Sequence, residues 1–262
     1  MKRFREFIKE ESEGSGIAMA DLDMVFINNA LKVSSFNISP TEFTNTKYKK
    51  EIQYLFNMHF FPKFDITKTI DVVDMGKLNT LITTLKTQDM AMFKRLHKYK
   101  LDGIGPGEMT LYFLINNAKL GGGKSGGIDL IVGSKNYEVK AAKITPNGIA
   151  YGFKLGATFS LDDIKRDLNT LRIKSKLDGS TSEISANKIK DMQQKYPAEY
   201  NAIESKFAKL SYDNYFKNHE VIFINNNDTP KVGNIEAIKK IMPNEISILE
   251  VTSGTIKPKI KL

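Results

Sequence analysis

The chain has 262 residues, of which 41% are hydrophobic and 26% are charged, so it can form one large domain or a core domain with an extension. Its net charge of +9 suits a polyanionic partner, although many basic proteins have the same balance. The absence of cysteine excludes disulfides, thiolate nucleophiles and cysteine-based zinc sites, and three widely separated histidines argue against a histidine metal centre or a Ser-His-Asp hydrolase.

Residues 1–102 are expected to form an N-terminal helical extension. Ser39-Pro40-Thr41-Glu42 has a capping serine, a first-turn proline and a glutamate at the third position, which predicts a helix start. Leu78, Leu81, Ile82 and Leu85 keep helical spacing and predict a second helix.

A basic cluster follows at the end of the helical pattern around 90–96. It contains Lys94, Arg95 and Lys98. These side chains either contact a phosphate backbone or complement the dipole at a helix C-terminus.

The segment from Gly105 to Lys143 predicts a helix, a glycine-rich loop and two strands. Apolar residues alternate with Asp129 in the first strand and with Glu138 and Lys140 in the second, so Glu138 and Lys140 share a face. The short, turn-rich loop at 133–136 predicts a hairpin, which brings Asp129 near Glu138. Two carboxylates suit Mg²⁺, and an adjacent lysine can position water or stabilise phosphate charge.

This pattern resembles the PD-(D/E)XK nuclease superfamily, the restriction-endonuclease-like fold. The resemblance rests on Asp129, Glu138-Val139-Lys140 and an upstream helical acid, Glu108. It implies that Asp129, Glu138 and the main-chain carbonyl of Val139 hold Mg²⁺, which Mn²⁺ can replace. It further implies that Lys140 orients the attacking water and that Glu108 is an auxiliary acid. The motif's usual proline before the aspartate is Ile128 here, which weakens the match.

The tripeptide of an acid, any residue and lysine is weak evidence by itself. It also occurs at Asp163-Ile164-Lys165 and Glu204-Ser205-Lys206, both in stretches with helical patterns. The alternative interpretation of Glu138 and Lys140 is an exposed strand face with ordinary charges. For Glu108, the alternative to a site role is a first-turn acid that complements the helix dipole.

The glycine-rich loop also imitates a phosphate-binding loop. Ala118 to Ser125 fits a relaxed pattern of a small residue, four residues and Gly-Lys-Ser. A phosphate-binding loop follows a strand and opens a helix, whereas the sequence predicts a helix before this loop and a strand after it. We therefore reject nucleotide hydrolysis. Under the nuclease interpretation, we expect Lys124 in this loop to contact a DNA backbone.

The remaining chain predicts strands at 149–155, 221–224 and 246–251, helices at 160–176 and 235–242, a helical insertion near 177–217 and a basic tail at 256–262. Residues 103–262 would thus form an α/β, restriction-endonuclease-like core, a mixed sheet flanked by helices.

The combined interpretation is a magnesium-dependent DNA endonuclease. The alternative is a non-catalytic nucleic-acid-binding or phage virion structural protein that retains the fold, because the start of the chain faintly resembles proteins of T-even-type phages. DNA is the expected partner, and a homodimer and a phage particle are further candidates. With no apolar run of membrane-spanning length and no signal-peptide core, we expect no membrane partner and a cytoplasmic or virion location.

Overall fold

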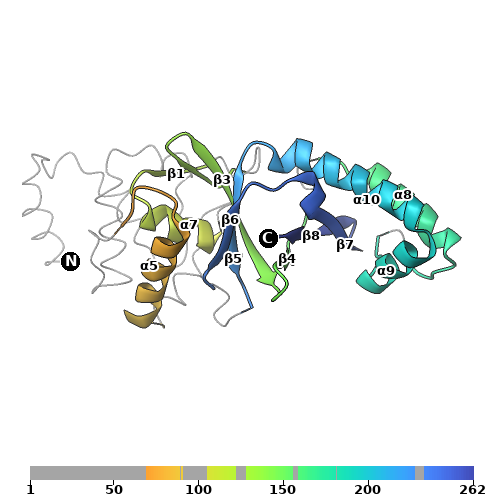
Figure 1. The fold of residues 1–262 in the computed structure, drawn as a ribbon, viewed down its shortest axis with the longest axis horizontal. Helices are drawn as coiled ribbons and strands as arrows, with labels where there is room; N and C mark the ends of the chain where they lie inside the picture. Colours follow the sequence, from red (N-terminus) through yellow and green to blue (C-terminus); the bar gives the residue numbers. More distant parts are fainter. Residues whose placement is uncertain are drawn as a thin grey trace, which may run out of the picture.

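In a computed structural model, the described residues are 69–88, 90, 105–121, 128–155, 159–180, 182–227 and 233–262 (Figure 1). The predicted helix after Ser39 lies outside these residues. The helical pattern around 90–96, apart from Met90, also lies outside them, as do His59, His97 and all four predicted DNA contacts, Lys94, Arg95, Lys98 and Lys124.

The described residues form a mixed α/β fold around an eight-stranded open sheet. The strands are β1 (Ala118–Leu120), β2 (Leu130–Val132), β3 (Lys135–Ile144), β4 (Ile149–Tyr151), β5 (Glu220–Asn225), β6 (Ile235–Lys239), β7 (Ile246–Thr252) and β8 (Thr255–Lys261). The helices are α5 (Met75–Gln88), α7 (Pro106–Leu114), α8 (Asp162–Lys174), α9 (Ala186–Lys195) and α10 (Pro197–Ser211), with a π-helical turn η3 (Tyr212–Phe216) and a 3₁₀ turn η4 (Pro243–Glu245).

Strand β3 joins the two halves of the sheet. One edge of β3 pairs antiparallel with β2 along Lys135–Tyr137 and then with β4 along Lys143–Ile144. On its other edge, β3 pairs in parallel with β5 along Tyr137–Ala142, and β5 pairs antiparallel with β6. Between its pairings with β2 and β4, the first edge of β3 therefore has no ladder partner among the described residues.

The predicted hairpin is confirmed. Strands β2 and β3 are joined by Gly133 and Ser134, with Leu130 opposite Tyr137 and Val132 opposite Lys135. Gly133 has φ +62°, a backbone conformation that costs glycine little and suits a two-residue hairpin turn.

The helices lie at two ends of the sheet (Figure 1). Helix α7 contacts β1 and β3, and α5 contacts β6. Helices α8, α9 and α10 pack together, and α9 and α10 lie against β7. The core at this end includes Leu168 of α8, Phe207 of α10 and Ile248 of β7, each at most 1% exposed.

Several sequence predictions were wrong. Residues 235–242 are not a helix, because β6 pairs with β5 and buries Ile235. The basic tail is strand β8, in which Ile256, Pro258 and Ile260 alternate with lysines and face the core. The alternation of apolar residues with lysines is present in the sequence. Pro258 argues against a strand there, because proline has no backbone N–H to donate to a ladder. Pro258 lies beside the bulge in β7, where the ladder is already interrupted.

Two features before β2 also differ from expectation. Ala118–Leu120 forms β1, so a strand, not a helix, precedes the glycine-rich loop. Asp129 lies immediately before β2 and not within it. The case against a phosphate-binding loop now rests on the element after the loop alone, because that element is strand β2 and not a helix.

Other predictions are confirmed. Helices are present at 75–88, 106–114 and 162–174, and strands at 149–151, 220–225 and 246–252. The segment 177–217 is largely helical, with α10 beginning at Pro197.

No helix among the described residues is long and apolar enough to cross a membrane.

Candidate functional site

Glu138 and Lys140 lie on one face of β3, as their spacing predicts. The Lys140 Nζ atom donates to Glu138 Oε1 in an ion pair. The Glu138 side chain is only 3% exposed, whereas that of Lys140 is 22% exposed. The interpretation as an exposed face with ordinary charges is therefore wrong for Glu138, because this carboxylate is buried.

Asp129 reaches the same place from the strand opposite. Its backbone N–H donates to the Tyr137 carbonyl at 2.9 Å, which continues the hairpin by one residue. Its Oδ2 atom accepts a 2.7 Å hydrogen bond from the Val139 N–H. The Asp129 side chain thereby replaces a ladder partner on the edge of β3 that β2 leaves unpaired.

Glu108 lies in the first turn of α7, three residues after the N-cap residue Gly105. A hydrogen bond with the backbone of Gly105 stabilises its charged form, which is one half of a capping box. The charges of Asp129, Lys140 and Glu138 also act on Glu108. Glu108 thus caps its helix and interacts electrostatically with the carboxylate cluster. Its role as an auxiliary acid stays a prediction.

The three carboxyl groups are difficult to ionise together. Burial, and next the charge of Asp129, raise the pKa of Glu108 to about 8. Burial also raises the pKa of Glu138 to about 7, although Lys140 opposes the shift. Burial likewise raises the pKa of Asp129. At neutral pH such a cluster favours an additional proton or a bound cation.

Tyr215 is a member of the site that the sequence analysis did not identify. It comes from η3, and its hydroxyl donates to Glu138 Oε1, the same oxygen that Lys140 contacts. The Lys140 Nζ atom lies 5.6 Å from the centroid of the Tyr215 ring. Burial, and next the charge of Glu138, raise the pKa of Tyr215, so its hydroxyl remains a donor. Nothing in the sequence linked this tyrosine to a carboxylate 77 positions earlier.

His219 packs behind Tyr215. The two rings meet edge to face, with centroids 5.5 Å apart. Burial, and next the charge of Lys140, lower the pKa of His219 to about 4, so the ring is neutral at pH 7. Within the described part of the chain, neither ring nitrogen has a hydrogen-bond partner. His219 therefore lies beside the site, where its ring packs against that of Tyr215.

The fit of a metal ion depends on which oxygens are available. Glu138 Oε2 is buried and has no hydrogen-bond partner among the described residues. Leaving a carboxylate oxygen without a partner is costly, and a cation would remove that cost. However, no group of three Asp, Glu or His side chains in the described ranges is arranged to hold one ion. Two carboxylates are a donor set that Mg²⁺ can accept, because this ion commonly takes one or two carboxylates and retains several waters.

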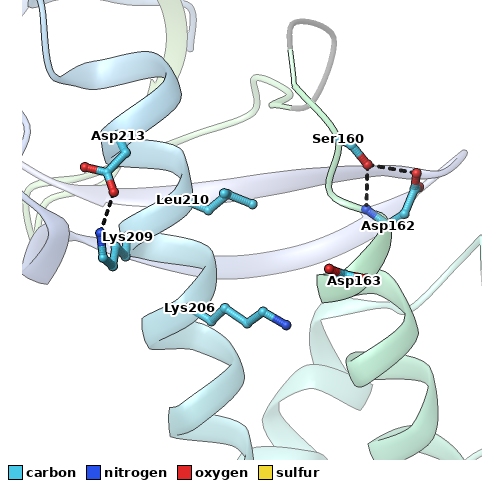
Figure 2. A pocket seen from close by; sticks show the side chains of 7 residues that line it. All are labelled: Ser160, Asp162, Asp163, Lys206, Lys209, Leu210 and Asp213. Atoms are coloured by element: carbon cyan, nitrogen blue, oxygen red, sulfur yellow. Dashed lines mark hydrogen bonds and ion pairs between the residues drawn. The ribbon is translucent and has the colours of Figure 1, made fainter.

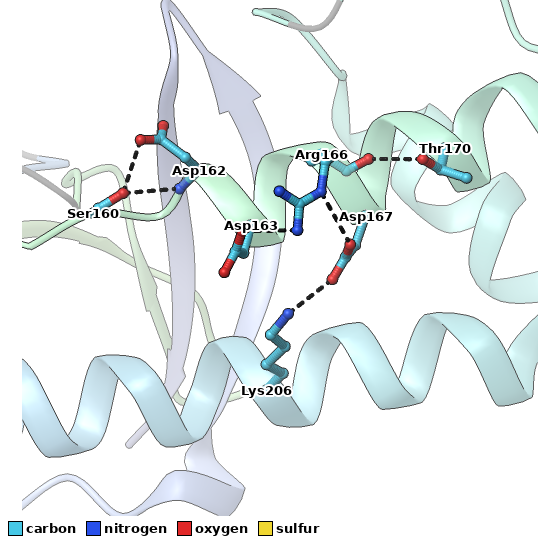
Figure 3. A network of polar contacts seen from close by, with 7 residues as sticks. All are labelled: Ser160, Asp162, Asp163, Arg166, Asp167, Thr170 and Lys206. Carbon is cyan, nitrogen blue, oxygen red and sulfur yellow. Dashed lines mark hydrogen bonds and ion pairs between the residues drawn. The ribbon is translucent and has the colours of Figure 1, made fainter.

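A separate cavity of about 400 Å³ lies between α8 and α10 (Figure 2). It is lined by Ser160, Asp162, Asp163, Lys206, Lys209, Leu210 and Asp213. Lys209 pairs with Asp213 at 2.6 Å, and Lys206 pairs with Asp167 at 3.0 Å. Figure 3 shows that Lys206 reaches from α10 to Asp167 on α8. The second of these ion pairs joins the two helices, and none of the predicted site residues lines this cavity.

Comparison with protein-family models, curated proteins and solved structures gave no match. The functional argument therefore depends on the chemistry of the cluster itself. The structure brings together Glu108, Asp129, Glu138 and Lys140 from α7, the residue before β2, and β3, and it places Val139 between two of them.

Proposed function

We propose that this chain is a metal-dependent DNA endonuclease with a restriction-endonuclease-like fold. The observation that carries the proposal is the buried carboxylate pair of Asp129 and Glu138 with Lys140 beside it. Glu138 retains an oxygen without a partner among the described residues, and burial raises the pKa of both carboxyl groups. Asp129 accepts from the Val139 N–H through Oδ2, and a metal ion would offset the cost of placing its charge beside that of Glu138.

The fold supports this assignment in general terms. Helix α7, the β2–β3 hairpin and the parallel partner β5 surround the cluster on a mixed sheet. This is the setting that the resemblance to PD-(D/E)XK nucleases implies. The assignment to that superfamily is part of the proposal.

In this proposal Asp129 and Glu138 hold Mg²⁺ or Mn²⁺, together with the main-chain carbonyl of Val139. The ion supplies Lewis-acid stabilisation of the phosphate and lowers the pKa of a bound water. Tyr215 orients Glu138 by donating to Oε1, which leaves Oε2 as the oxygen that would bind the ion. Lys140 orients the attacking water and stabilises charge on the phosphate. Glu108 is an auxiliary acid at the edge of the site, and its pKa of about 8 favours the protonated form at neutral pH in the metal-free protein.

One observation favours a second candidate, a non-catalytic nucleic-acid-binding protein of the same fold. Lys140 is engaged by Glu138, and Tyr215 shares the same carboxylate oxygen. A lysine held in this way has a structural role whether or not chemistry occurs. A phage virion protein, a homodimer and a cytoplasmic or virion location also remain predictions.

Cleavage assays distinguish the two candidates. Supercoiled plasmid, linear duplex and single strands would be incubated with wild-type protein in Mg²⁺, Mn²⁺ or EDTA. Lys140→Ala should lower cleavage by on the order of a hundredfold, whereas Lys165→Ala, in the matched tripeptide on α8, should leave it unchanged. Metal-dependent nicking or linearisation lost only in Lys140→Ala supports the nuclease.

Metal binding needs a readout that does not depend on cleavage. The melting temperature of wild-type protein should rise with Mg²⁺ or Mn²⁺, because a ligand that binds the folded state stabilises it. Glu138→Gln should lose this response, and Asp163→Asn should retain it. Metal stabilisation without cleavage of any substrate would favour the binding protein, and metal-independent cleavage would exclude the proposed mechanism.

A further inference from the structure

One face of the sheet formed by the end of β3 with β4, β8 and β7 is solvated. The opposite face is buried against α8, α9 and α10, where Ala150, Ile260 and Ile248 belong to the helix-packed core. On each of these strands, the residues that alternate with the buried ones are half-buried or exposed. Antiparallel sheets commonly have one packed and one solvated face, so exposure alone does not indicate a function.

The composition of this solvated face is more informative. Lys143 lies opposite Tyr151 in the β3–β4 ladder, and Tyr151 lies opposite Lys259 in the β4–β8 ladder. Residues opposite each other in a ladder project from the same face. The three side chains therefore form one row, in which a tyrosine stands between two lysines. Lys261, opposite Ile149, lies beside this row on the same face. We call these four residues, Lys143, Tyr151, Lys259 and Lys261, the lysine–tyrosine face.

Several lysines on the helices are neutralised by a carboxylate. Lys165, Lys174, Lys188, Lys206 and Lys209 each form an ion pair with a carboxylate. Among the described residues, no carboxylate pairs with Lys143, Lys259 or Lys261. Glu250 on β7 is taken by Lys257 at 2.6 Å. The charge of Lys261 acts on Glu245, which already pairs with Lys239. Lys143 and Lys259 have no ion-pair partner within the described part of the chain, and their charge is available to an external polyanion.

We propose that the lysine–tyrosine face binds single-stranded nucleic acid. Lysines two strands apart are separated by about 10 Å, which follows from the strand spacing of a sheet. In this arrangement, phosphates lie against the lysines and a base stacks on the Tyr151 ring between them. Charged grooves with aromatic stacking positions bind single strands with little sequence preference, and a sheet face with exposed aromatics is a known platform for bases.

This inference goes beyond the proposed function, because binding here needs neither a metal nor the carboxylate cluster. Lys143 follows Lys140 by three residues and projects from the opposite face of β3. A bound strand would therefore lie near the carboxylate cluster but on the other side of the sheet. Success or failure of cleavage says nothing about this face, and the two proposals can be tested separately.

The test is fluorescence anisotropy in EDTA, with a labelled single-stranded oligonucleotide and a duplex of the same length. Lys143→Gln/Lys259→Gln should lower the salt dependence of single-strand binding. The slope of the logarithm of the binding constant against the logarithm of the salt concentration should fall in magnitude by about 1.4, for two lost phosphate contacts. Tyr151→Ala should weaken single-strand binding by about 5-fold to about 150-fold, the range for one stacked base, and Tyr151→Phe should not. The matched charge control is Lys77→Gln/Lys190→Gln, on α5 and α9, and circular dichroism checks the folding of each variant.

The outcomes are separable. Losses confined to the variants of the lysine–tyrosine face support the inference, even if the protein cleaves nothing. Equal losses in the Lys77/Lys190 control would show binding by diffuse charge and would overturn it. A neutral Tyr151→Ala variant, or a Tyr151→Phe variant as weak as Tyr151→Ala, would exclude stacking and overturn it too. Tight binding to anionic lipid vesicles without oligonucleotide binding would overturn it in favour of a membrane surface.

Discussion

Replacing Glu138 with glutamine tests the buried carboxylate without removing its contacts. In the metal-free protein, burial raises the pKa of Glu138 from 4.5 to about 7. Because the folded-state pKa is raised, the folded protein binds the proton more tightly than the unfolded chain between these two values. Stability should therefore fall as pH rises from about 4.5 to 7, and the loss is complete above pH 7. The shift of about 2.5 pKa units corresponds to an upper limit of about 3 kcal/mol.

Glu138→Gln removes this penalty, while its amide oxygen can still accept from Tyr215 and Lys140. The variant should gain stability relative to wild type at pH 8, by up to about 3 kcal/mol, and little or nothing at pH 4.5. Urea unfolding in EDTA at pH 4.5, 6, 7 and 8 measures the difference directly. The control is Glu199→Gln on α10. Lys174 lowers the pKa of the exposed Glu199, so its substitution should have the opposite, weak trend. A Glu138→Gln effect that is the same at every pH, or destabilisation that grows with pH, would refute the argument from burial.

The same cluster gives three further predictions. Lys140→Ala should lower cleavage by on the order of a hundredfold, the loss expected for a charge stabiliser, and should also destabilise the metal-free protein at pH 8, because Glu138 loses its ion-pair partner. Unchanged cleavage by a folded variant would remove lysine from the mechanism. Tyr215→Phe should lower the free energy of unfolding at pH 8, measured with urea, by about 1.5–3 kcal/mol, the value of a hydrogen bond to a charged group. Tyr212→Phe in the same turn should lower it by less. Equal losses in the two variants would show that the contact with Glu138 does not stabilise the protein. Asp129→Asn should abolish stabilisation by Mg²⁺, which for wild type should reach about 2.7 kcal/mol at a hundred times the dissociation constant, and a retained response would place the ion elsewhere.

Local patterns in the sequence determined the hairpin and the pairing of its charges. Alternation between apolar and charged residues placed Glu138 and Lys140 on one face, and the short loop brought Asp129 across from them. These inferences succeeded because strand periodicity and tight turns depend on neighbours within a few residues. The position of Glu108 in the first turn of α7 was predictable for the same reason.

Patterns compatible with two structures were decided by long-range pairing. Ile235 and Ile238 suit either a helix face or a strand, and only pairing with β5 makes this segment a strand. The lysines of β8 look like a basic tail until Ile256 and Ile260 pack on the helical layer. Propensity is overridden in such cases because burial of the apolar side chains contributes more than local preference.

Tertiary structure also decided the chemistry of the site. The sequence names the carboxylates, but only packing buries them and raises the pKa of Glu138 and Glu108. Tyr215 reaches Glu138 because α10 and η3 return the chain to β3. The row of Lys143, Tyr151 and Lys259 exists only once β3, β4 and β8 are in register. Burial and cross-strand register are properties of the assembled sheet, which is why a pattern read along the chain contains neither.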